Sequence, residues 1–361
     1  MALKKIFFRV DSSKQIGGGH LLRCLTLADR LKECADITFL CRDLEGNLGS
    51  LVTRAGFTLK YLPRCNNNDG ILIGYEELLT VPAAIDAEQT KACFGDDRAD
   101  WLIIDSYALG FAWEQSLRPF AKKIMVIDDL ANRRHDCDLL LDQNYLENFE
   151  QRYDGLVEDD CKKLLGLQYV LLREEFYEQR KNMRLRDGNI KNILVSFGSS
   201  DNTNETGKVL VALDAIKNYV GTVHIVVGKN SPHNEQIEAF CRQRKNIHFY
   251  CQIDFIANLM NTADLAIGAG GSTIWERCFL QLPSMVMSVA DNQVAGCEFC
   301  AGKGLIDYLG AAEHVTVPLL KKRVENYLCN GKALHKLQVN GRELFQEVRQ
   351  GYVQINELLL Q

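Results

Sequence analysis

The sequence predicts an α/β protein of two Rossmann-like domains whose parallel sheets face a central cleft. Short apolar runs alternate with helical patterns along the chain, and continuous apolar strands separated by helices are typical of a parallel sheet covered on both faces. About twelve such runs occur, more than one doubly wound sheet usually contains. The length of 361 residues also exceeds that of one ordinary domain.

The predicted strands are shared equally between the two halves of the chain. In the first half they are residues 5–10, 37–41, 57–62, 101–105, 124–128 and 139–142. In the second half they are residues 193–197, 223–227, 247–250, 265–267, 284–289 and 305–308. Each half opens with a strand, a glycine-containing loop and a helix, which indicates two similar halves. In such sheets ligands bind beyond the carboxyl ends of the strands.

A charged stretch, residues 173–191, predicts the boundary between the halves. It is rich in Arg, Lys and Glu and contains the turn signal Asp187-Gly188-Asn189. We therefore expect the following division of the chain. It consists of an N-terminal domain over residues 1–175, a linker over 176–190, a C-terminal domain over 191–335 and a helical tail over 336–361.

The composition excludes several classes of protein. Apolar residues make up 47% and charged residues 25%, as in soluble globular proteins. The net charge of -5 provides no basic face for a nucleic acid. No apolar run approaches the roughly 20 residues of a membrane span, and we expect no signal peptide. The thirteen cysteines are odd in number and scattered, so we expect free thiols in a cytoplasmic protein.

The loop after the first predicted strand is the first candidate site. It runs from Asp11 to His20, and an amphipathic helix begins near its end. Glycines such as Gly17 and Gly19 let a backbone approach a ligand, and a helix N-terminus favours a neutral histidine that can accept a proton. The alternative is a tight turn with an exposed histidine. The loop has neither the P-loop pattern nor a dinucleotide fingerprint, whose third glycine is replaced by Leu22.

A second loop with the same setting lies at residues 267–277. It reads Ile-Gly-Ala-Gly-Gly-Ser-Thr-Ile-Trp-Glu-Arg and links an apolar strand to a helix. Amides and hydroxyls of Gly271, Ser272 and Thr273 could hold a diphosphate, and Glu276 could reach a ribose diol. The alternative is a close contact between strand and helix that requires small residues.

Polar groups also end the predicted strands at residues 101–107, 127–129, 196–204 and 290–293, and a polar tetrad precedes the strand at 139–142. At residues 196–204, Asp201 or Thr203 could simply cap the next helix, which we expect for Asp201. Amides at residues 290–293 could bind a sugar or could cap a helix. The tetrad His-Asp-Cys-Asp at residues 135–138 resembles a set of metal ligands. We expect a solvated loop there, because no histidine pair at ligand spacing accompanies it.

Taken together, the motifs resemble the UDP-sugar hydrolases of pseudaminic acid biosynthesis, the PseG family. The family's substrate is UDP-2,4-diacetamido-2,4,6-trideoxy-β-L-altropyranose. The matching stretches are residues 11–20, 104–107, 126–129, 135–138, 171–176, 196–201, 268–273 and 291–293. They extend over nearly the whole chain. Ser106 stands where the family commonly has histidine, a difference that concerns the sugar pocket more than the reaction class.

The resemblance implies a GT-B architecture and hydrolysis at the sugar–phosphate linkage without a metal or cofactor. His20 matches the family's general base. The resemblance and the motifs together predict a set of substrate-binding residues. They are Asp11, Gly17, Gly19, Tyr107, Gly198, Gly271, Ser272, Thr273, Glu276, Asn292 and Gln293. The family also implies that the product finally decorates flagellin or a surface polysaccharide.

The hypothesis for the reaction is that water held by neutral His20 attacks the anomeric carbon opposite UDP, with inversion. The expected partners are a UDP-sugar and water, with no nucleic acid and no membrane, and we expect a monomer. There are three alternatives. The first is a GT-B glycosyltransferase, which would need an acceptor. The others are a UDP-sugar 2-epimerase and a non-catalytic nucleotide-binding protein.

Overall fold

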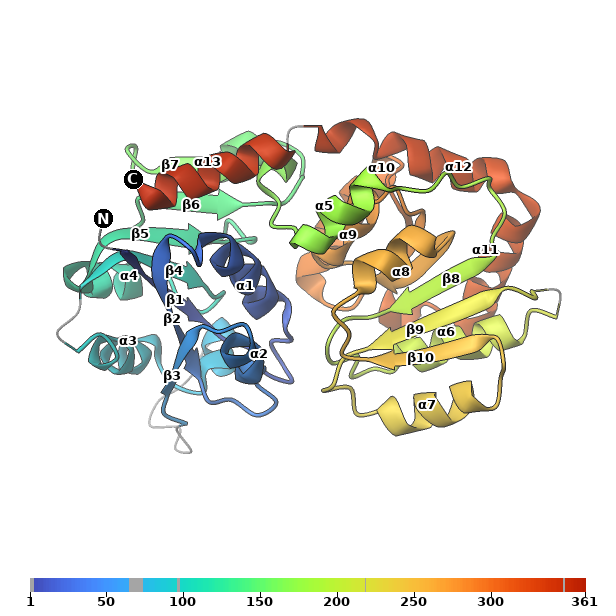
Figure 1. The fold of residues 1–361 in the computed structure, drawn as a ribbon, viewed down its shortest axis with the longest axis horizontal. Coiled ribbons are helices and arrows are strands. Elements are labelled where there is room, and N and C mark those ends of the chain that lie inside the picture. The colour runs from blue at the N-terminus through green and yellow to red at the C-terminus, as the bar shows by residue number, and fades with distance from the viewer. Residues whose placement is uncertain (1–2, 65–73, 96–97, 218, 347) are drawn as a thin grey trace. The chain divides into compact units, whose positions relative to one another are not determined.

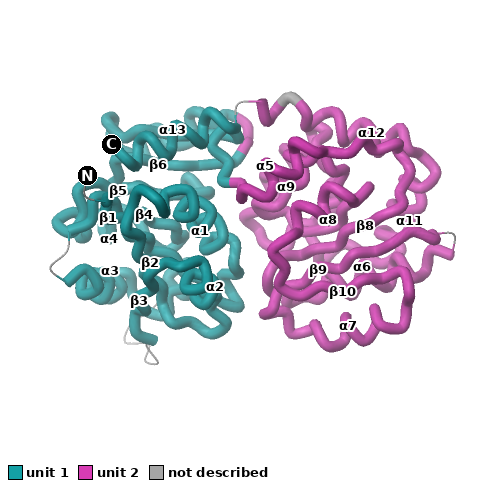
Figure 2. Tube along the Cα trace, viewed as in Figure 1, with its two compact units in different colours: residues 1–144, 148–171, 347–361 teal, residues 145–147, 172–346 magenta. Residues whose placement is uncertain are grey.

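The computed structural model describes residues 3–64, 74–95, 98–217, 219–346 and 348–361. The chain forms two compact units (Figure 2). Unit 1 consists of residues 1–144, 148–171 and 347–361, and unit 2 of residues 145–147 and 172–346.

Unit 1 contains a seven-stranded parallel sheet in the order β3-β2-β1-β4-β5-β6-β7. Its strands are β1 (Lys4–Val10), β2 (Ala35–Arg42), β3 (Thr58–Leu62), β4 (Ala99–Asp105), β5 (Ala121–Ile127), β6 (Leu139–Asp142) and β7 (Lys162–Leu165). Its α-helices are α1 (Gly19–Leu31), α2 (Gly49–Arg54), α3 (Ala83–Ala92), α4 (Phe111–Leu117) and α13 (Val348–Leu360).

Unit 2 contains a six-stranded parallel sheet in the order β10-β9-β8-β11-β12-β13 (Figure 1). Its strands are β8 (Asn192–Ser196), β9 (Thr222–Val227), β10 (Ile247–Cys251), β11 (Leu265–Ala269), β12 (Ser284–Ser288) and β13 (Asp307–Ala311). Its α-helices are α5 (Glu174–Lys181), α6 (Glu205–Asp214), α7 (Asn234–Arg242), α8 (Ile256–Thr262), α9 (Thr273–Phe279), α10 (Val294–Gly302), α11 (Val317–Cys329) and α12 (Gly331–Asn340).

Most strands contain a continuous apolar stretch, because both faces of each sheet are covered. Along β4, Trp101 and Ile103 belong to the core that α1, α2 and α13 cover, whereas Leu102 and Ile104 belong to the core beneath α3 and α4. Alternate residues of a strand point to opposite faces, so a strand buried on both faces is apolar at successive positions, as at residues 101–104. This confirms the prediction of parallel sheets between layers of helices.

The described residues form thirteen strands, and the twelve predicted ones are among them. The additional strand is β7, whose sequence Lys-Lys-Leu-Leu is short and half charged. It lies at the edge of the sheet, where charged residues are tolerated. A short edge strand lacks the continuous apolar run by which the others were predicted. The last strand, predicted at 305–308, lies slightly later, at Asp307–Ala311.

The two units divide the chain differently from the predicted domain bounds. Residues 176–190, predicted as a linker, belong to unit 2. There, Tyr177 of α5 packs edge-on against Phe279 of α9, with ring centroids 5.3 Å apart. Arg186 donates five hydrogen bonds to backbone carbonyls of the same unit. The stretch is charged because its arginines bind carbonyl groups, and not because it is a solvated connector.

The predicted helical tail is also divided, because α13 returns to unit 1. Its apolar stripe of Tyr352, Ile355 and Leu359 is buried in the core of that unit. Gly351 lets the helix approach closely, since a Cβ there would lie 2.1 Å from the carbonyl oxygen of Gln168. An amphipathic pattern predicts a helix with one buried face, but it does not say which core that face covers.

Three buried charged side chains tie the sheet of unit 1 to α3. Asp86 accepts hydrogen bonds from Arg9 at 2.6 Å and from Arg42 at 2.5 Å, and the Trp113 indole donates to it at 3.0 Å. Burial would raise the pKa of Asp86, but the two guanidinium groups outweigh this effect and lower it. Asp86 therefore stays ionised and compensates two buried cations.

Asp86→Asn should lower the free energy of unfolding by about 3–5 kcal/mol, because it leaves buried guanidinium charge uncompensated. Urea unfolding of the full chain measures this loss. Glu88→Gln is the matched control, because Glu88 lies on the same helix, is 72% exposed and pairs only at the surface with Lys91. Its expected cost is below about 1 kcal/mol. Equal losses in both variants would contradict the role of Asp86.

Candidate active site

His20 lies at the start of α1, directly after the glycine loop that follows β1. The loop folds back on itself, because the Gly17 amide donates to the Ser13 carbonyl at 2.9 Å. Gly17 has a φ of 78°, a backbone conformation that glycine adopts without strain. Gly18 caps α1 without a side chain, and a Cβ on Gly19 would meet open space. The first amides of α1 are therefore accessible beside the histidine.

Asp105, the last residue of β4, holds His20 in place. One carboxylate oxygen accepts from His20 Nδ1 at 2.6 Å, and the two oxygens together accept two hydrogen bonds from Arg23, at 2.6 and 2.7 Å. Asp105 is buried, and burial would raise its pKa. Arg23 and His20 outweigh that effect and hold the pKa of Asp105 well below its ordinary value. An ionised carboxylate only accepts hydrogen bonds, so His20 Nδ1 carries a proton.

A second carboxylate extends this network to Tyr107. Asp129, which follows β5, accepts from Arg23 at 2.9 Å, from the Tyr107 hydroxyl at 2.9 Å and from Asn144 at 2.8 Å. Burial and the neighbouring Asp129 raise the pKa of Tyr107, so its hydroxyl stays a donor. The Tyr107 ring meets the His20 ring edge-on, with centroids 4.5 Å apart. The network thus fixes both rings.

This arrangement allows His20 to act as a general base. Its Nδ1–H donates to Asp105, which leaves the lone pair on Nε2, and the side chain is 12% exposed. Two carboxylates surround a single guanidinium at this site. The Asp105 carboxylate holds the ring in the tautomer and orientation that this role requires. The His20 side chain is therefore mostly buried and has a hydrogen-bond partner, unlike the exposed histidine of the alternative.

Asp11 is placed differently from the other predicted substrate-binding residues. Its side chain is buried, pairs with Arg9 at 2.7 Å and accepts from the backbone amide of Arg42 at 2.6 Å. These contacts join the ends of β1 and β2. The geometry favours a structural role for this carboxylate, below the loop that carries His20.

In unit 2, the second glycine loop joins β11 to α9. A Cβ on Gly268 would lie 2.3 Å from the carbonyl oxygen of Ser196, and one on Gly270 would lie 2.3 Å from Cys297 Sγ. Packing thus requires glycine at these two positions, as the alternative interpretation predicted. Gly271 differs, because the nearest atom to a Cβ there would be 3.6 Å away. Ser272 follows with an exposed side chain, and Thr273 begins the helix.

Glu276 lies one turn into α9 with its carboxylate partly buried. Burial raises its pKa, while Arg173 and Arg277 counteract that rise. The Arg173 guanidinium is 3.4 Å from the carboxylate, a long contact, and it pairs more closely with Glu175 at 2.7 Å. Glu276 is therefore weakly held by the protein and available to hydrogen-bond a ligand hydroxyl.

The side chain of Gln293 joins the predicted segment at residues 290–293 to the glycine loop that follows β11. Gln293 ends the 3₁₀ turn Asp291–Gln293, accepts from the Val289 amide at 3.0 Å and packs beside Gly270 and Gly271. Asn292, in the same turn, is exposed.

The loop after β8 contributes Gly198, whose φ is 88° and where a Cβ would meet open space. Asp201 accepts from the amides of Glu205 and Thr206 at 2.8 and 3.0 Å, which confirms its predicted role as a helix cap.

The tetrad at residues 135–138 is engaged by protein groups. His135 contacts Glu114 at 2.6 Å, and Asp136 and Asp138 both pair with Arg118. Among the described residues no three metal-ligating side chains lie together. In the same part of the chain, no helix is long and apolar enough to cross a membrane.

The sequence motifs do not single out Arg23, and they include Asp105 and Asp129 only as polar groups at the ends of strands, without a role in the site. Signals for them exist. Arg23 is three residues after His20, so the two share a helix face. Asp105 and Asp129 each follow an apolar run, and the ends of adjacent parallel strands meet at one edge of the sheet.

The chain is similar to named hydrolases. Residues 192–294 match the glycosyltransferase family 28 C-terminal domain. Over 301 residues the chain is 27% identical to the UDP-2,4-diacetamido-2,4,6-trideoxy-beta-L-altropyranose hydrolase of Campylobacter jejuni, covering 83% of this chain and 97% of that protein. Over 235 residues it is 27% identical to the pseudaminic acid cytidylyltransferase and UDP-2,4-diacetamido-2,4,6-trideoxy-beta-L-altropyranose hydrolase of Helicobacter pylori, covering 63% and 40%. These matches confirm the resemblance to the PseG family.

Solved structures show the same fold at low sequence identity. MurG of Acinetobacter baumannii aligns with a TM-score of 0.61 and 15% identity over 99% of both chains. The UDP-GlcNAc 2-epimerase of Neisseria meningitidis aligns with a TM-score of 0.64 and 11% identity, over 99% of this chain and 100% of that one. The likeness to GT-B glycosyltransferases confirms the predicted class of two Rossmann-like domains.

Asp105→Asn should destabilise the protein by about 3 kcal/mol at neutral pH, because it removes the charge that compensates Arg23. The folded state lowers the pKa of Asp105, so its contribution is complete above about pH 5 and declines as the pH falls below roughly 4. Urea unfolding at several pH values measures the gap to wild type. The control is Asp29→Asn. Asp29 lies on α1, the helix that carries His20 and Arg23, and forms an exposed surface pair with Lys32. A gap that widens on acidification would refute this account.

Proposed function

We propose that this protein is a UDP-sugar hydrolase of pseudaminic acid biosynthesis. It removes UDP from UDP-2,4-diacetamido-2,4,6-trideoxy-β-L-altropyranose and gives 2,4-diacetamido-2,4,6-trideoxy-L-altrose. The observation that carries the proposal is the pair His20–Asp105, at 2.6 Å, with the second ring nitrogen of His20 left to accept a proton. The similarity to the named hydrolase of Campylobacter jejuni over 83% of this chain supports the substrate class.

Unit 2 binds the nucleotide in this proposal. The loop from Gly271 to Thr273 offers amides and hydroxyls to the diphosphate, and Glu276 accepts hydrogen bonds from the ribose. The match of residues 192–294 to a glycosyltransferase C-terminal domain supports this assignment. Asn292 and Gln293, which lie in the adjacent turn, bind the polar groups of the sugar. Gly198 leaves space at the end of β8 for a ligand.

Unit 1 supplies the chemistry. A water molecule donates a hydrogen bond to His20 Nε2 and attacks the anomeric carbon from the face opposite UDP. The new C–O bond forms as the bond to the β-phosphate oxygen breaks, His20 takes the proton, and UDP leaves with the bonding electron pair. The anomeric configuration inverts. Tyr107 lines the sugar position, and the open backbone at Gly17 and Gly19 allows close approach.

The proposed reaction needs no metal, because loop amides and hydroxyls stabilise the leaving diphosphate. We also propose a cytoplasmic location. The twelve described cysteines are free thiols, and eight of them are buried, which fits a reducing compartment.

The domain match also favours a second candidate, a glycosyltransferase that uses the same nucleotide loop. Such an enzyme would transfer the sugar to an acceptor hydroxyl and would show little hydrolysis without one. Rapid release of free sugar in water alone therefore separates the two functions.

His20→Ala should lower kcat by roughly 10²–10⁴-fold, because general-base catalysis contributes that factor. UDP affinity should not change, since His20 belongs to unit 1. Steady-state release of UDP measures the rate, and calorimetric titration measures UDP binding. The control is His314→Ala, at a histidine 78% exposed on unit 2. Activity near that of wild type in the His20 variant would exclude it as the base.

Hydrolysis in ¹⁸O-labelled water should place the label in the free sugar, because water attacks carbon. Mass spectrometry of both products reads the label. Label in UDP would mean attack at phosphorus, and the His20 mechanism would then be wrong. Freshly released sugar, followed by NMR before mutarotation, should have the inverted anomeric configuration.

A further inference from the structure

Arg277 of α9 is a buried cation with few partners. Only 2% of its surface is exposed. Its Nη2 donates to the carbonyl oxygen of Ala269 at 2.7 Å, and its Nε has no hydrogen-bond partner. No ion pair joins it to a carboxylate within the described parts of the chain. Guanidinium groups do not lose their proton in proteins, so this charge is buried without an ion-pair partner.

Arg186, in the same unit, shows how a buried arginine is otherwise satisfied. It is 6% exposed and donates five hydrogen bonds to carbonyl oxygens at the ends of α8 and α9. Those dipoles replace the lost water. Arg277 has a single bond of this kind, although it is buried more deeply. Such incomplete compensation is costly and indicates that a further group completes it.

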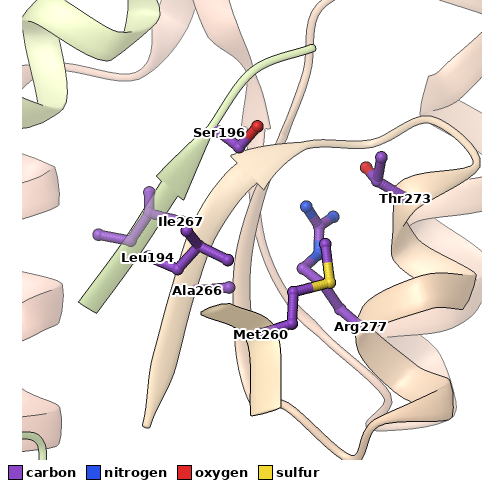
Figure 3. Close-up of a pocket in the computed structure, with 7 residues that line it drawn as sticks. All are labelled: Leu194, Ser196, Met260, Ala266, Ile267, Thr273 and Arg277. Carbon is purple, nitrogen blue, oxygen red and sulfur yellow. The ribbon is translucent and has the colours of Figure 1, made fainter. Parts of the chain in front are cut away.

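The Arg277 side chain reaches into a small pocket that has room for about one water molecule. Figure 3 shows Ser196 and Thr273 at the same end of this pocket as the guanidinium, while Met260 and Ala266 lie at the other end. Ser196 ends β8, and Thr273 ends the loop that follows β11. The charge therefore lies beneath the Gly271–Thr273 loop, at the carboxyl edge of the sheet.

We propose that Arg277 is a positioning residue that supplies the buried counter-charge for the diphosphate of the nucleotide, and that it makes unit 2 select nucleoside diphosphates over nucleosides. This inference rests on the proposed function, because it takes the diphosphate to lie on the same loop. Arg277 acts in two ways. Its bond to Ala269 fixes the last residue of β11, where the loop begins. Its charge acts through a water-poor interior, where electrostatic interactions are screened less than at the surface.

Glu276 is the charged neighbour that could weaken this effect. It is adjacent in sequence to Arg277 but makes no ion pair with it within the described residues. Burial raises the pKa of Glu276, which opposes full ionisation in the absence of ligand. The positive charge of Arg277 is therefore incompletely neutralised by its own helix.

The test compares the affinities of the full chain for UDP, UMP and uridine by calorimetric titration. Arg277→Gln removes the charge but keeps a donor for Ala269, and Arg277→Lys keeps the charge. The Gln variant should bind UDP about tenfold more weakly than wild type does. Its affinity for UMP should fall less, and its affinity for uridine should stay within about twofold of wild type. The Lys variant should retain most of the preference for UDP over uridine.

Arg186→Met is the matched control, because it removes another buried arginine from the same unit. It should lower the unfolding temperature and leave the ratio of the uridine and UDP affinities unchanged. If the role of Arg277 were purely structural, its substitution would weaken the binding of all three ligands alike. The Lys and Gln variants would then have the same affinities. Either result would overturn the inference.

If the Gln variant is too unstable to titrate, thermal unfolding with saturating UDP replaces the titration. UDP should raise the unfolding temperature of the Arg186→Met variant as much as it raises that of wild type. It should raise the unfolding temperature of the Arg277→Gln variant much less. Equal stabilisation would refute the inference. A wild-type chain that binds no UDP would instead refute the proposed function, so the two failures are distinguishable.

Discussion

The ionised carboxylate of Asp105 is the contact on which the candidate site of unit 1 depends. It accepts from His20 and, through both oxygens, from Arg23, and Arg23 in turn holds Asp129. A strand shifted by one residue would turn this carboxylate to the other face of the sheet, and His20 would lose its partner. The arrangement requires a parallel sheet, because only there do β1, β4 and β5 all end at one edge.

The buried side chains at the two candidate sites, one in each unit, differ in the sign of their net charge. Around His20, two carboxylates face one guanidinium, so the side-chain charges of this network are net negative. Beneath the second glycine loop, Arg277 is buried with one carbonyl contact, so that site tolerates an additional anion. Hydrolysis of a UDP-sugar requires both properties, a group that accepts a proton from water and a group that receives the departing diphosphate. The opposite signs of charge thus match the two roles.

The fold class could be predicted from the sequence because strands buried on both faces contain continuous apolar runs, as residues 101–104 of β4 show. The motif residues His20 and Tyr107 could also be found, since each follows such a strand. The contact between Arg23 and Asp129 could not be predicted, because the two residues lie 106 positions apart in sequence and meet only through strand order. Asp11 shows the converse error. This motif residue, in the loop that leads to His20, is buried and bonded to Arg9 and to the backbone amide of Arg42 on the neighbouring strand.

The return of α13 to unit 1 has a consequence for synthesis on the ribosome. Unit 2 is complete once residue 346 has been made, whereas unit 1 waits for residues 347–361. Until then the core beside α1 lacks Tyr352, Ile355 and Leu359 and leaves apolar surface exposed to water. The half of the chain that is translated first therefore finishes folding last, and a stop codon a few residues early would damage unit 1, which contains His20, while sparing unit 2.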